Sequence, residues 1–392
     1  MDDTPTFYEF FAGGGMARAG LGASWRCLFA NDHDPLKAKV YADNWGCSAF
    51  DDRDVRLVEA ADVPGRAVLA WASFPCQDLS VAGGGRGLGL AGADPNNSTR
   101  SGAFWPFLDL LRALGREKRA PGIVVLENVL GLLTANEGRD FAAVASALAA
   151  SGHRFGALVV DAKHFLPQSR PRVFVVATRQ GGNDPSRRLS ASGPRQPWHT
   201  EAVARAQRCL PPAVAERWVW WDPGQPPRAG LDLSDVVLEE GEGVVWNTAE
   251  QTARLLSLMS DTNLKRVEEA KRSGRRSVGS VFLRMRPAGG VNVQRAEVSF
   301  SPAAGCLRTP RGGASRPRVL VIEGERVRSR LLSPREAAVL MGLPPGYALP
   351  PNYDHAFRVI GDGVVVPVVA FLRERLLDPL VGAGKASARR AA

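Results

Sequence analysis

The sequence predicts an α/β fold: a doubly wound, Rossmann-like sheet whose last strand is antiparallel, together with a smaller and irregular second domain. Short apolar runs of strand length alternate with helix-length segments through the first part of the chain, which is typical of a parallel sheet. Two late apolar runs, residues 155–161 and 173–177, are joined by a link of about ten residues. That link is too short for a helical crossover, so we expect these two strands to be antiparallel. From residue 181 onward, glycine and proline interrupt the regular patterns and indicate a second domain.

The composition favours a globular cytoplasmic protein with a polyanionic partner. Of the 392 residues, 45% are apolar and 23% are charged, and the formal net charge is +10. No run approaches ~18 consecutive apolar residues, and residues 1–5 lack the basic start and apolar core of a signal peptide. We therefore expect no membrane association. The five cysteines and five histidines are scattered without any CxxC pair, so neither a disulfide framework nor a metal site is expected.

A strand, a glycine turn and a helix open the chain. Residues 6–11 form a short apolar run, residues 12–15 read Ala-Gly-Gly-Gly, and residues 16–21 should form a helix that ends at Gly22. This order is typical of a nucleotide-binding α/β unit. The dinucleotide fingerprint requires a further glycine where this chain has Arg18. The turn therefore disfavours a pyrophosphate ligand, whereas an adenosine-type ligand is still accommodated.

Acidic residues follow the glycine turn at a spacing suited to a ribose. The next strand, residues 26–30, is followed by Asp32, about twenty positions after the glycines, where a carboxylate can hydrogen-bond ribose hydroxyls. Asp51 and Asp52 come after a further short segment. Each acid could equally be a helix cap or a solvated charge, so only the set supports a ligand site.

A cysteine follows the buried strand predicted over residues 67–72. Pro75, Cys76 and Gln77 lie in the loop just past that strand, and ligands gather at the carboxyl ends of strands in open α/β sheets. A thiol in such a loop can serve as a nucleophile when a positively charged neighbourhood favours the thiolate. The alternative is a half-buried structural cysteine.

Further polar residues are expected at the same sheet edge. Glu127 ends the next buried strand, where a carboxyl can act as a general acid, although it could equally cap a helix. The antiparallel strand should begin at this edge, and Gln168, Arg170 and Arg172 precede or open it at a spacing of two. In an extended chain these three side chains share one face. Two guanidinium groups aimed at Cys76 would favour its thiolate and grip an anionic or carbonyl ligand.

The loop after Cys76 and a basic insert are the other notable segments. Seven glycines lie between Gly83 and Gly102, which predicts either a lid over the site or a disordered insertion. Between Lys265 and Arg318 there are 13 Lys or Arg residues against 3 Glu. Their alternation with small and apolar residues fits contacts to phosphates and base edges, and the alternative is a solvated basic face.

Two helices are predicted near the end of the chain. Ser333 and Glu336 form a capping box with Pro334 at the first helical position, and this helix should run to Met341. A last helix is expected over residues 366–377, followed by a basic, alanine-rich tail.

Taken in order, these pieces resemble the motifs of the DNA cytosine-5 methyltransferase family in its compact bacterial form. The matching segments are residues 11–15, 74–77 with Ser80, 100–101, 127–129, 168–172, 330–336 and 361–365. They follow the family's order and span most of the chain. Residues 183–325 match no motif, as expected of a variable target-recognition region. Asp362 stands where the family usually has asparagine.

The resemblance implies an enzyme that takes a methyl group from S-adenosylmethionine and places it on C5 of a specific, flipped-out cytosine in double-stranded DNA. Cys76 would attack C6, and Glu127 would protonate or hydrogen-bond N3. Arg172, together with Arg170, would hold the base carbonyl or a phosphate. The residues implied in cofactor binding are Phe11, Ala12, Gly13, Gly15, Asp32, Asp51, Asp52, Pro75 and Asp362. The predicted DNA-binding residues are Ser80 and Arg86 in and after the cysteine motif and, from the basic insert, Arg284, Arg286, Arg308 and Arg311.

The resemblance also implies two domains with different functions. Residues 1–182 and 352–392 would form the catalytic domain, and residues 183–351 the target-recognition domain. We expect a monomer, and a cognate restriction endonuclease, where one exists, would act independently. Two alternatives stay open: methylation of cytosine in RNA, and a non-catalytic DNA-binding protein of the same fold. The large basic insert argues against the first, and the intact set of Cys76, Glu127 and Arg172 argues against the second.

Overall fold

The chain forms two compact units. The computed structural model describes residues 4–79, 87–89, 99–179, 188–288, 290–310 and 313–382. The first unit comprises Met1–Asp161, Pro171–Pro226 and Val364–Ala392, and the second comprises Ala162–Arg170 and Pro227–Gly363. Residues 162–170, 183–226 and 352–363 thus group differently from the expected domain boundaries. The functional division of the chain stays a prediction.

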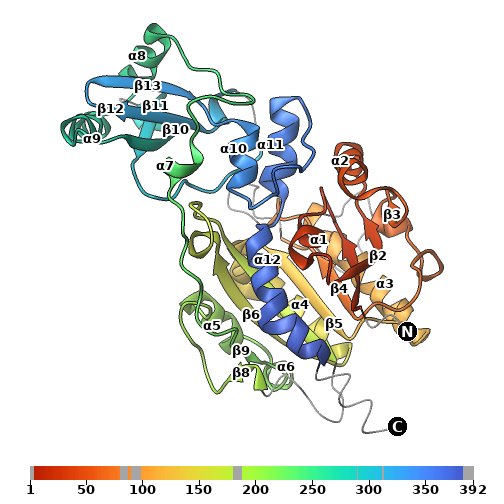
Figure 1. Cartoon of the computed structure of the whole chain (residues 1–392). Coiled ribbons are helices and arrows are strands. Elements are labelled where there is room, and N and C mark those ends of the chain that lie inside the picture. Colours follow the sequence, from red (N-terminus) through yellow and green to blue (C-terminus); the bar gives the residue numbers. More distant parts are fainter. Residues whose placement is uncertain are drawn as a thin grey trace. The chain divides into compact units, whose positions relative to one another are not determined.

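The first unit is built on a seven-stranded sheet with the order β3-β2-β1-β4-β5-β7-β6 (Figure 1). Neighbouring strands are parallel from β3 to β5, whereas β7 is antiparallel to both β5 and β6. This confirms the predicted antiparallel pair. The strands are β1 Thr6–Phe10, β2 Arg26–Asn31, β3 Phe50–Asp51, β4 Leu69–Ala72, β5 Ile123–Asn128, β6 His153–Asp161 and β7 Pro171–Arg179.

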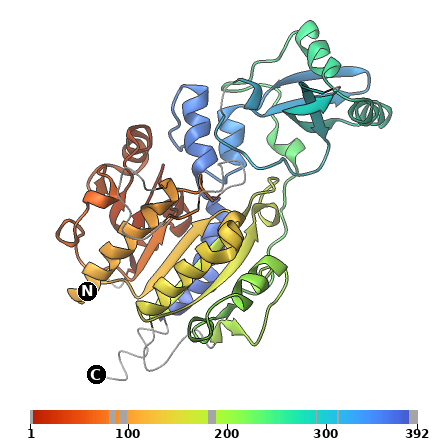
Figure 2. The same cartoon turned by 180° about the vertical axis from the view of Figure 1, so that it is seen from behind.

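Helices cover both faces of this sheet, as expected of a doubly wound fold. The helices α3 and α4 lie on the face turned toward the viewer in Figure 2, whereas α12 lies on the face seen in Figure 1. The helices α1 and α12 approach closely, because a Cβ atom on Gly20 would lie 2.4 Å from Cβ of Val369. The helices are α1 Met16–Leu21, α2 Pro35–Trp45, α3 Phe104–Arg116, α4 Arg139–Ala150, α5 Glu201–Arg208, α6 Pro212–Ala215 and α12 Val366–Leu372.

The core of the first unit follows the sequence pattern. Every residue of β4 and β5 is buried, as expected of central strands that are covered on both faces. Helix α3 buries Phe104, Phe107, Leu108, Leu111 and Leu114, which recur at helical spacing along one side. Short strands β8 Ser190–Ala191 and β9 Trp220–Trp221 form a separate antiparallel pair.

The second unit is more regular than its glycine and proline content suggests. It holds a four-stranded antiparallel sheet with the order β11-β10-β12-β13, whose core residues include Val281, Ala296 and Leu320. The strands are β10 Ser277–Ala288, β11 Val291–Ser299, β12 Arg318–Glu323 and β13 Arg326–Leu331. The helices are α7 Leu233–Val236, α8 Ala249–Ser257, α9 Asp261–Arg272, α10 Pro334–Val339 and α11 Tyr353–Asp362.

The predicted capping box is present at α10. The hydroxyl of Ser333 accepts from the backbone N–H of Glu336 at 3.2 Å, and the Glu336 carboxylate accepts from the backbone N–H of Ser333 at 2.8 Å. The helix ends at Val339, which is earlier than Met341. The carboxylate of Glu336 also binds Arg330, and both side chains are fully buried.

One helical stretch, Tyr353–Gly382, is long and apolar enough to cross a membrane by length and composition alone, although no such segment was expected. Of its most apolar window, 61% is buried inside the protein. The stretch is also interrupted between Asp362 and Val366. Buried core helices share these properties, and we assign the stretch to the core.

Candidate active site

The loop that carries Cys76 follows β4 and is attached to the two strands that flank β4 at the carboxyl edge of the first sheet. The backbone N–H of Ser73 donates to the carbonyl of Phe10, where β1 ends, at 3.3 Å. The side-chain amide of Asn128, at the end of β5, donates to the carbonyl of Phe74 at 3.0 Å. These bonds place Pro75 and Cys76, both partly buried, at the edge that the sequence predicts.

Glu127 and Arg172 meet at this edge. The register pairs Glu127 with Phe174 and Asn128 with Val173, so the start of β7 lies beside the end of β5. Nε of Arg172 lies 3.4 Å from Oε1 of Glu127, and the two side chains are 16% and 9% exposed. The structure therefore confirms that this carboxyl and this guanidinium lie close together.

Close backbone packing shapes the turn that follows Cys76. The backbone N–H of Leu79 donates to the carbonyl of Cys76 at 3.1 Å. A Cβ atom on Gly131 would lie only 1.9 Å from the carbonyl oxygen of Leu79, so this position can hold no side chain. The glycine after β5 thus allows the turn to pack directly on the segment that follows Glu127.

Asp78 anchors the segments on either side of the glycine-rich stretch, a role that sequence reasoning missed. Its carboxylate accepts from the backbone N–H groups of Arg100 at 2.7 Å and Ser101 at 3.3 Å, and its carbonyl accepts from Gly87 at 2.9 Å. Asp78 is 1% exposed. The predicted DNA contacts Ser80 and Arg86, like most of the predicted lid, lie outside the described residues.

The glycine turn after β1 has the backbone geometry of a ligand-binding turn. Phe11, Gly13 and Gly15 have φ values of 55°, 56° and 78°, and a positive φ is uncommon for phenylalanine. The backbone N–H of Gly13 donates to Oδ2 of Asp32 at 2.9 Å, and that of Ala12 donates to the carbonyl of the residue before Asp32 at 3.0 Å. The end of β2 thus supports the turn directly.

Two aromatic residues of α2, Tyr41 and Trp45, pack against the turn. The indole Nε1 of Trp45 donates to the carbonyl of Gly14 at 3.0 Å, and a Cβ atom on Gly15 would lie 2.3 Å from that nitrogen. The guanidinium of Arg18 lies 4.9 Å from the centre of the Trp45 ring and donates to the hydroxyl of Tyr41 at 2.9 Å. Sequence reasoning left this helix unassigned, although an Asp-Pro start and aromatic residues four positions apart signal it.

A buried carboxyl lies beneath the same turn. Glu9 in β1 is 1% exposed, and its Oε1 accepts from the backbone N–H of Arg18 at 3.2 Å. Its Oε2 has no hydrogen-bond partner among the described residues. Burial raises the pKa of Glu9 to about 8, and the hydrogen bond and charge of Arg18 offset only part of that effect.

The other predicted ribose-binding acids have different surroundings. Asp51 is paired with Arg53 at 2.6 Å, and hydrogen bonds from this arginine hold the pKa of Asp51 below its usual value. The backbone carbonyl of Asp51 accepts from the side chain of Asn31 at 3.0 Å. Asp52 is exposed. The cofactor roles of both acids stay predictions.

The expectation that Gln168, Arg170 and Arg172 share one face is wrong. Arg170 is 3% exposed and donates to the backbone carbonyls of Leu307 at 2.7 Å, Gly361 at 2.7 Å and Gly363 at 2.8 Å, all within the second unit. The amide of Gln168 is likewise buried in the second unit, where it donates and accepts backbone hydrogen bonds. The alternation fails because β7 begins only at Pro171, so the preceding residues are not in a continuous strand.

Asp362 lies at the end of α11, within the second unit. The hydroxyl of Thr309 donates to its Oδ1 at 2.8 Å. The preceding Gly361 is packed so closely that a Cβ atom would lie 2.6 Å from the backbone nitrogen of Thr309. Arg170 therefore joins this motif to the segment around Leu307, and the predicted cofactor contact of Asp362 stays a prediction.

The predicted DNA-binding arginines of the second unit are exposed. Arg284 and Arg286 lie on β10 and are 55% and 50% exposed, and both pair with Glu297. Arg308 is exposed as well. Arg311 lies outside the described residues.

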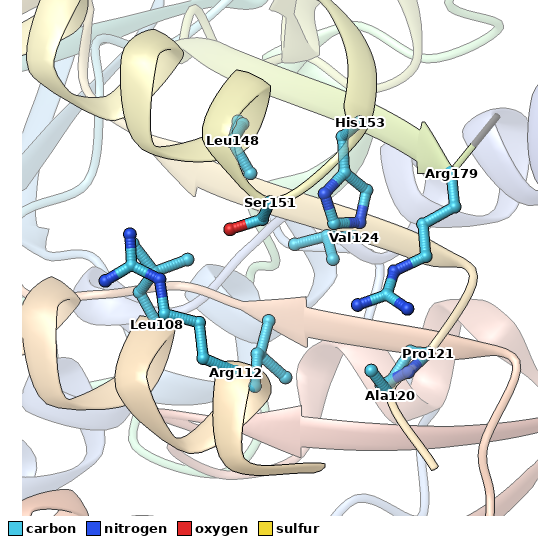
Figure 3. Close-up of a pocket in the computed structure, with 10 residues that line it drawn as sticks. Leu108, Arg112, Ala120, Pro121, Val124, Leu148, Ser151, His153 and Arg179 are labelled. Carbon is cyan, nitrogen blue, oxygen red and sulfur yellow. The ribbon is translucent and has the colours of Figure 1, made fainter. Parts of the chain in front are cut away.

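A small pocket opens at the opposite edge of the first sheet (Figure 3). It has a cavity volume of about 20 Å³, enough for one water molecule, and His153 and Arg179 line it where β6 begins and β7 ends. Burial lowers the pKa of His153 to about 4. Since this pocket lies at the other end of the strands from Glu127, we do not assign it to the candidate site.

The comparisons with known proteins agree with this geometry. The family model described as C-5 cytosine-specific DNA methylase matches residues 5–378. The type II methyltransferase M.HhaI of Haemophilus parahaemolyticus is 24% identical over 368 residues, which cover 93% of this chain and 92% of the relative. M.BsuFI of Bacillus subtilis is 34% identical over 173 residues, which cover 44% of this chain and 38% of the relative.

Solved structures show the same fold. The Entamoeba histolytica methyltransferase EhMeth superimposes with a TM-score of 0.58 at 14% identity and covers 97% of this chain and 99% of its own. The Dnmt2 methyltransferase of S. pombe gives a TM-score of 0.54 at 17% identity and covers 96% of this chain and 99% of its own. With the family model matched over nearly the whole sequence, the chain belongs to the C-5 cytosine-specific DNA methylase family and is a DNA (cytosine-5-)-methyltransferase.

Proposed function

We propose that the enzyme transfers a methyl group from S-adenosylmethionine to C5 of a specific cytosine in double-stranded DNA, through base flipping and a covalent bond between Cys76 and C6. The observation that carries the proposal is the meeting of three groups at one sheet edge. The Cys76 loop is bound to the ends of β1 and β5, and Glu127 and Arg172 lie together at the end of β5. This arrangement supports a site that combines a nucleophile, an acid and a cation.

The turn after β1 fits an adenosine-type cofactor. A Cβ atom on Gly13 would meet nothing within 4 Å, so the turn leaves open space there, and the carboxylate of Asp32 lies directly beside it. Phe11, Ala12, Gly13, Gly15 and Asp32 would form this cradle, and Asp51, Asp52, Pro75 and Asp362 are the further predicted contacts. When bound, S-adenosylmethionine supplies an electrophilic methyl group on a sulfonium.

The protein groups would act in sequence on a cytosine that has left the base stack. The Cys76 thiolate forms a bond to C6, and the electron pair of the C5–C6 double bond makes C5 nucleophilic. Glu127, in its protonated form, donates its proton to N3 and so favours this addition, and it takes that proton back when Cys76 leaves. After C5 has taken the methyl group, a base removes the C5 proton, the double bond re-forms, and Cys76 leaves as the thiolate.

The two arginines would contribute differently. Arg172 lies beside Glu127 and can orient that carboxyl or hold the base carbonyl. Arg170 is bound to three backbone carbonyls of the second unit, which supports a positioning role for it. The exposed arginines of the second unit would contact DNA.

The setting of the reaction is part of the proposal. Several relatives are named type II methyltransferases, which supports a role in restriction–modification. We propose a monomeric, cytoplasmic enzyme, and any cognate endonuclease would act independently.

Substitution of the nucleophile tests the mechanism. Cys76→Ala should lower transfer of labelled methyl groups to DNA by roughly 10⁴-fold or more, because no other group replaces the thiolate. Binding of DNA and of S-adenosylmethionine should be retained. The matched control is Cys209→Ala, which removes an exposed thiol elsewhere in the same unit and should leave the rate unchanged.

Two results would contradict the proposal. One is near wild-type transfer by Cys76→Ala, and the other is transfer by the wild-type enzyme to RNA but not to DNA. If DNA is methylated, bisulfite sequencing of DNA from cells that express the enzyme would identify the target sequence.

A further inference from the structure

The β10–β11 hairpin presents two chemically different faces. Val281 and Leu283 on β10 pair in register with Val298 and Ala296 on β11. Three of these four side chains are buried in the core of the second unit, and Leu283 packs against them. Side chains alternate along a strand, so the residues between them point to the other face. That face carries the exposed charges of the hairpin.

Glu297 holds two arginines on the charged face. Its Oε2 lies 3.1 Å from Nε of Arg284, and its Oε1 accepts from Nε of Arg286 at 2.6 Å. Glu297 itself is 31% exposed. One carboxylate thus occupies two guanidinium groups that the sequence predicts to bind DNA.

The hairpin contains no other acid. Glu297 is the single acidic residue between Ser277 and Ser299. Arg295 lies opposite Arg284 in the register and has no acidic partner among the described residues. The face therefore carries three cations and one anion.

A carboxylate and a phosphate are interchangeable partners for a guanidinium, since both offer oxygen pairs to the same donors. Ion pairs as exposed as these contribute little free energy, so a DNA phosphate can displace the carboxylate. Each displaced ion pair nevertheless makes the free energy of DNA binding less favourable by the free energy of that pair. This loss is the same for every DNA sequence, because phosphates carry no sequence information.

We propose that Glu297 is an intramolecular competitor of DNA phosphate, which weakens non-specific binding by the hairpin. This inference rests on the proposed function, in that it takes DNA as the ligand of this face. Binding to the target site would gain further contacts to base edges, whereas binding to other sequences depends on phosphate contacts alone. Glu297 would therefore lower the affinity for both by the same factor, so that non-specific complexes become weak while the target site is still held by its base contacts.

The test is a gain of affinity, which misfolding cannot produce. Glu297→Gln should tighten binding of a short random-sequence DNA duplex by roughly 3- to 10-fold at low salt, because two guanidinium groups are released. The dependence of affinity on salt should become steeper. Glu325→Gln is the matched control: it makes the same change in net charge in the same unit, at a side chain that is 91% exposed and 3.7 Å from Lys271. It should tighten binding by less than twofold.

A mutational cycle assigns the effect to the arginines. In a variant that already carries Arg284→Gln and Arg286→Gln, the additional Glu297→Gln change should leave the affinity for the duplex unchanged. If Glu297→Gln alone leaves the affinity unchanged or tightens it no more than the control does, the inference is wrong. Weaker binding would also overturn it and would indicate that Glu297 contacts a base directly.

The two proposals fail in different ways. If wild-type enzyme transfers no labelled methyl group to DNA, the proposed function fails. If it methylates DNA but Glu297→Gln binds the duplex as wild type does, only the competitor role fails.

Discussion

Two carboxylate–guanidinium pairs in this chain have different surroundings. In the second unit, Glu336 accepts from Arg330 at 2.6 and 2.8 Å and from the backbone N–H groups of Leu238 and Ser333 at 2.8 Å each. Both charged side chains of this pair are fully buried. In the first unit, the closest approach of the pair at the end of β5 is 3.4 Å, and both side chains keep some exposure.

The difference distinguishes a structural pair from one that the proposed function assigns to the substrate. Burial raises the pKa of Glu336, but the hydrogen bonds from Arg330 and the backbone outweigh it, and the net pKa is lowered. Both oxygens of that carboxylate are bound twice, so it has little capacity for another partner. The pair of Glu127 and Arg172 is longer and more exposed, and in the proposed function it would exchange partners when a base enters the site. Substitution of Glu127 should therefore lower the activity more than the stability, whereas substitution of Glu336 should lower mainly the stability.

The largest effect is expected at Glu127. Glu127→Gln should lower the rate of methyl transfer to DNA by about 10²- to 10⁴-fold, because an amide cannot deliver a proton to N3. The free energy of unfolding should fall by less than in Glu336→Gln, because the lost pair is longer and its side chains keep some exposure. Single-turnover assays and urea denaturation provide these two values. A variant that keeps the wild-type rate would remove Glu127 from the mechanism.

The next effect is expected at Glu336. Glu336→Gln should lower the free energy of unfolding by about 3–5 kcal/mol, because the charge of Arg330 would be left buried without its counter-ion. Urea denaturation followed by circular dichroism measures this loss. The control is Glu242→Gln, whose carboxylate is 80% exposed and 3.5 Å from Arg335, and which should cost less than about 1 kcal/mol. Equal losses in the two variants would contradict the comparison.

The effect that is smallest within any one pH unit concerns Glu9, a buried carboxyl whose pKa burial raises to about 8 from its ordinary value of 4.5. A raised pKa means that the folded state holds the proton more tightly, so this contribution to stability is present at low pH and is lost as pH rises. Between pH 5 and 8, the free energy of unfolding should fall by up to roughly 1.4 kcal/mol per pH unit relative to Glu9→Gln, which does not titrate. Urea denaturation of both proteins at several pH values measures this difference. If their free energies of unfolding change equally with pH, the buried acid is not protonated in the folded state.

Local signals in the sequence predicted much of the fold. The helix Met16–Leu21 has the expected bounds, and the capping box at Ser333 is present. These features depend on residues within a few positions of one another, so their patterns are visible in the sequence. The antiparallel pair of β6 and β7 was also predictable, because the length of the connecting link decides it.

The sequence by itself also predicted that Cys76, Glu127 and Arg172 lie at one edge of the sheet, since the positions of strand ends follow from strand order and direction. Only the tertiary structure decided the partners of Arg170, Trp45 and Asp78. Arg170 binds carbonyls that lie 137 to 193 positions away in the chain. Backbone carbonyls carry no side-chain signature, and their positions depend on how distant segments pack. Contacts of that kind therefore appear only when the chain is folded.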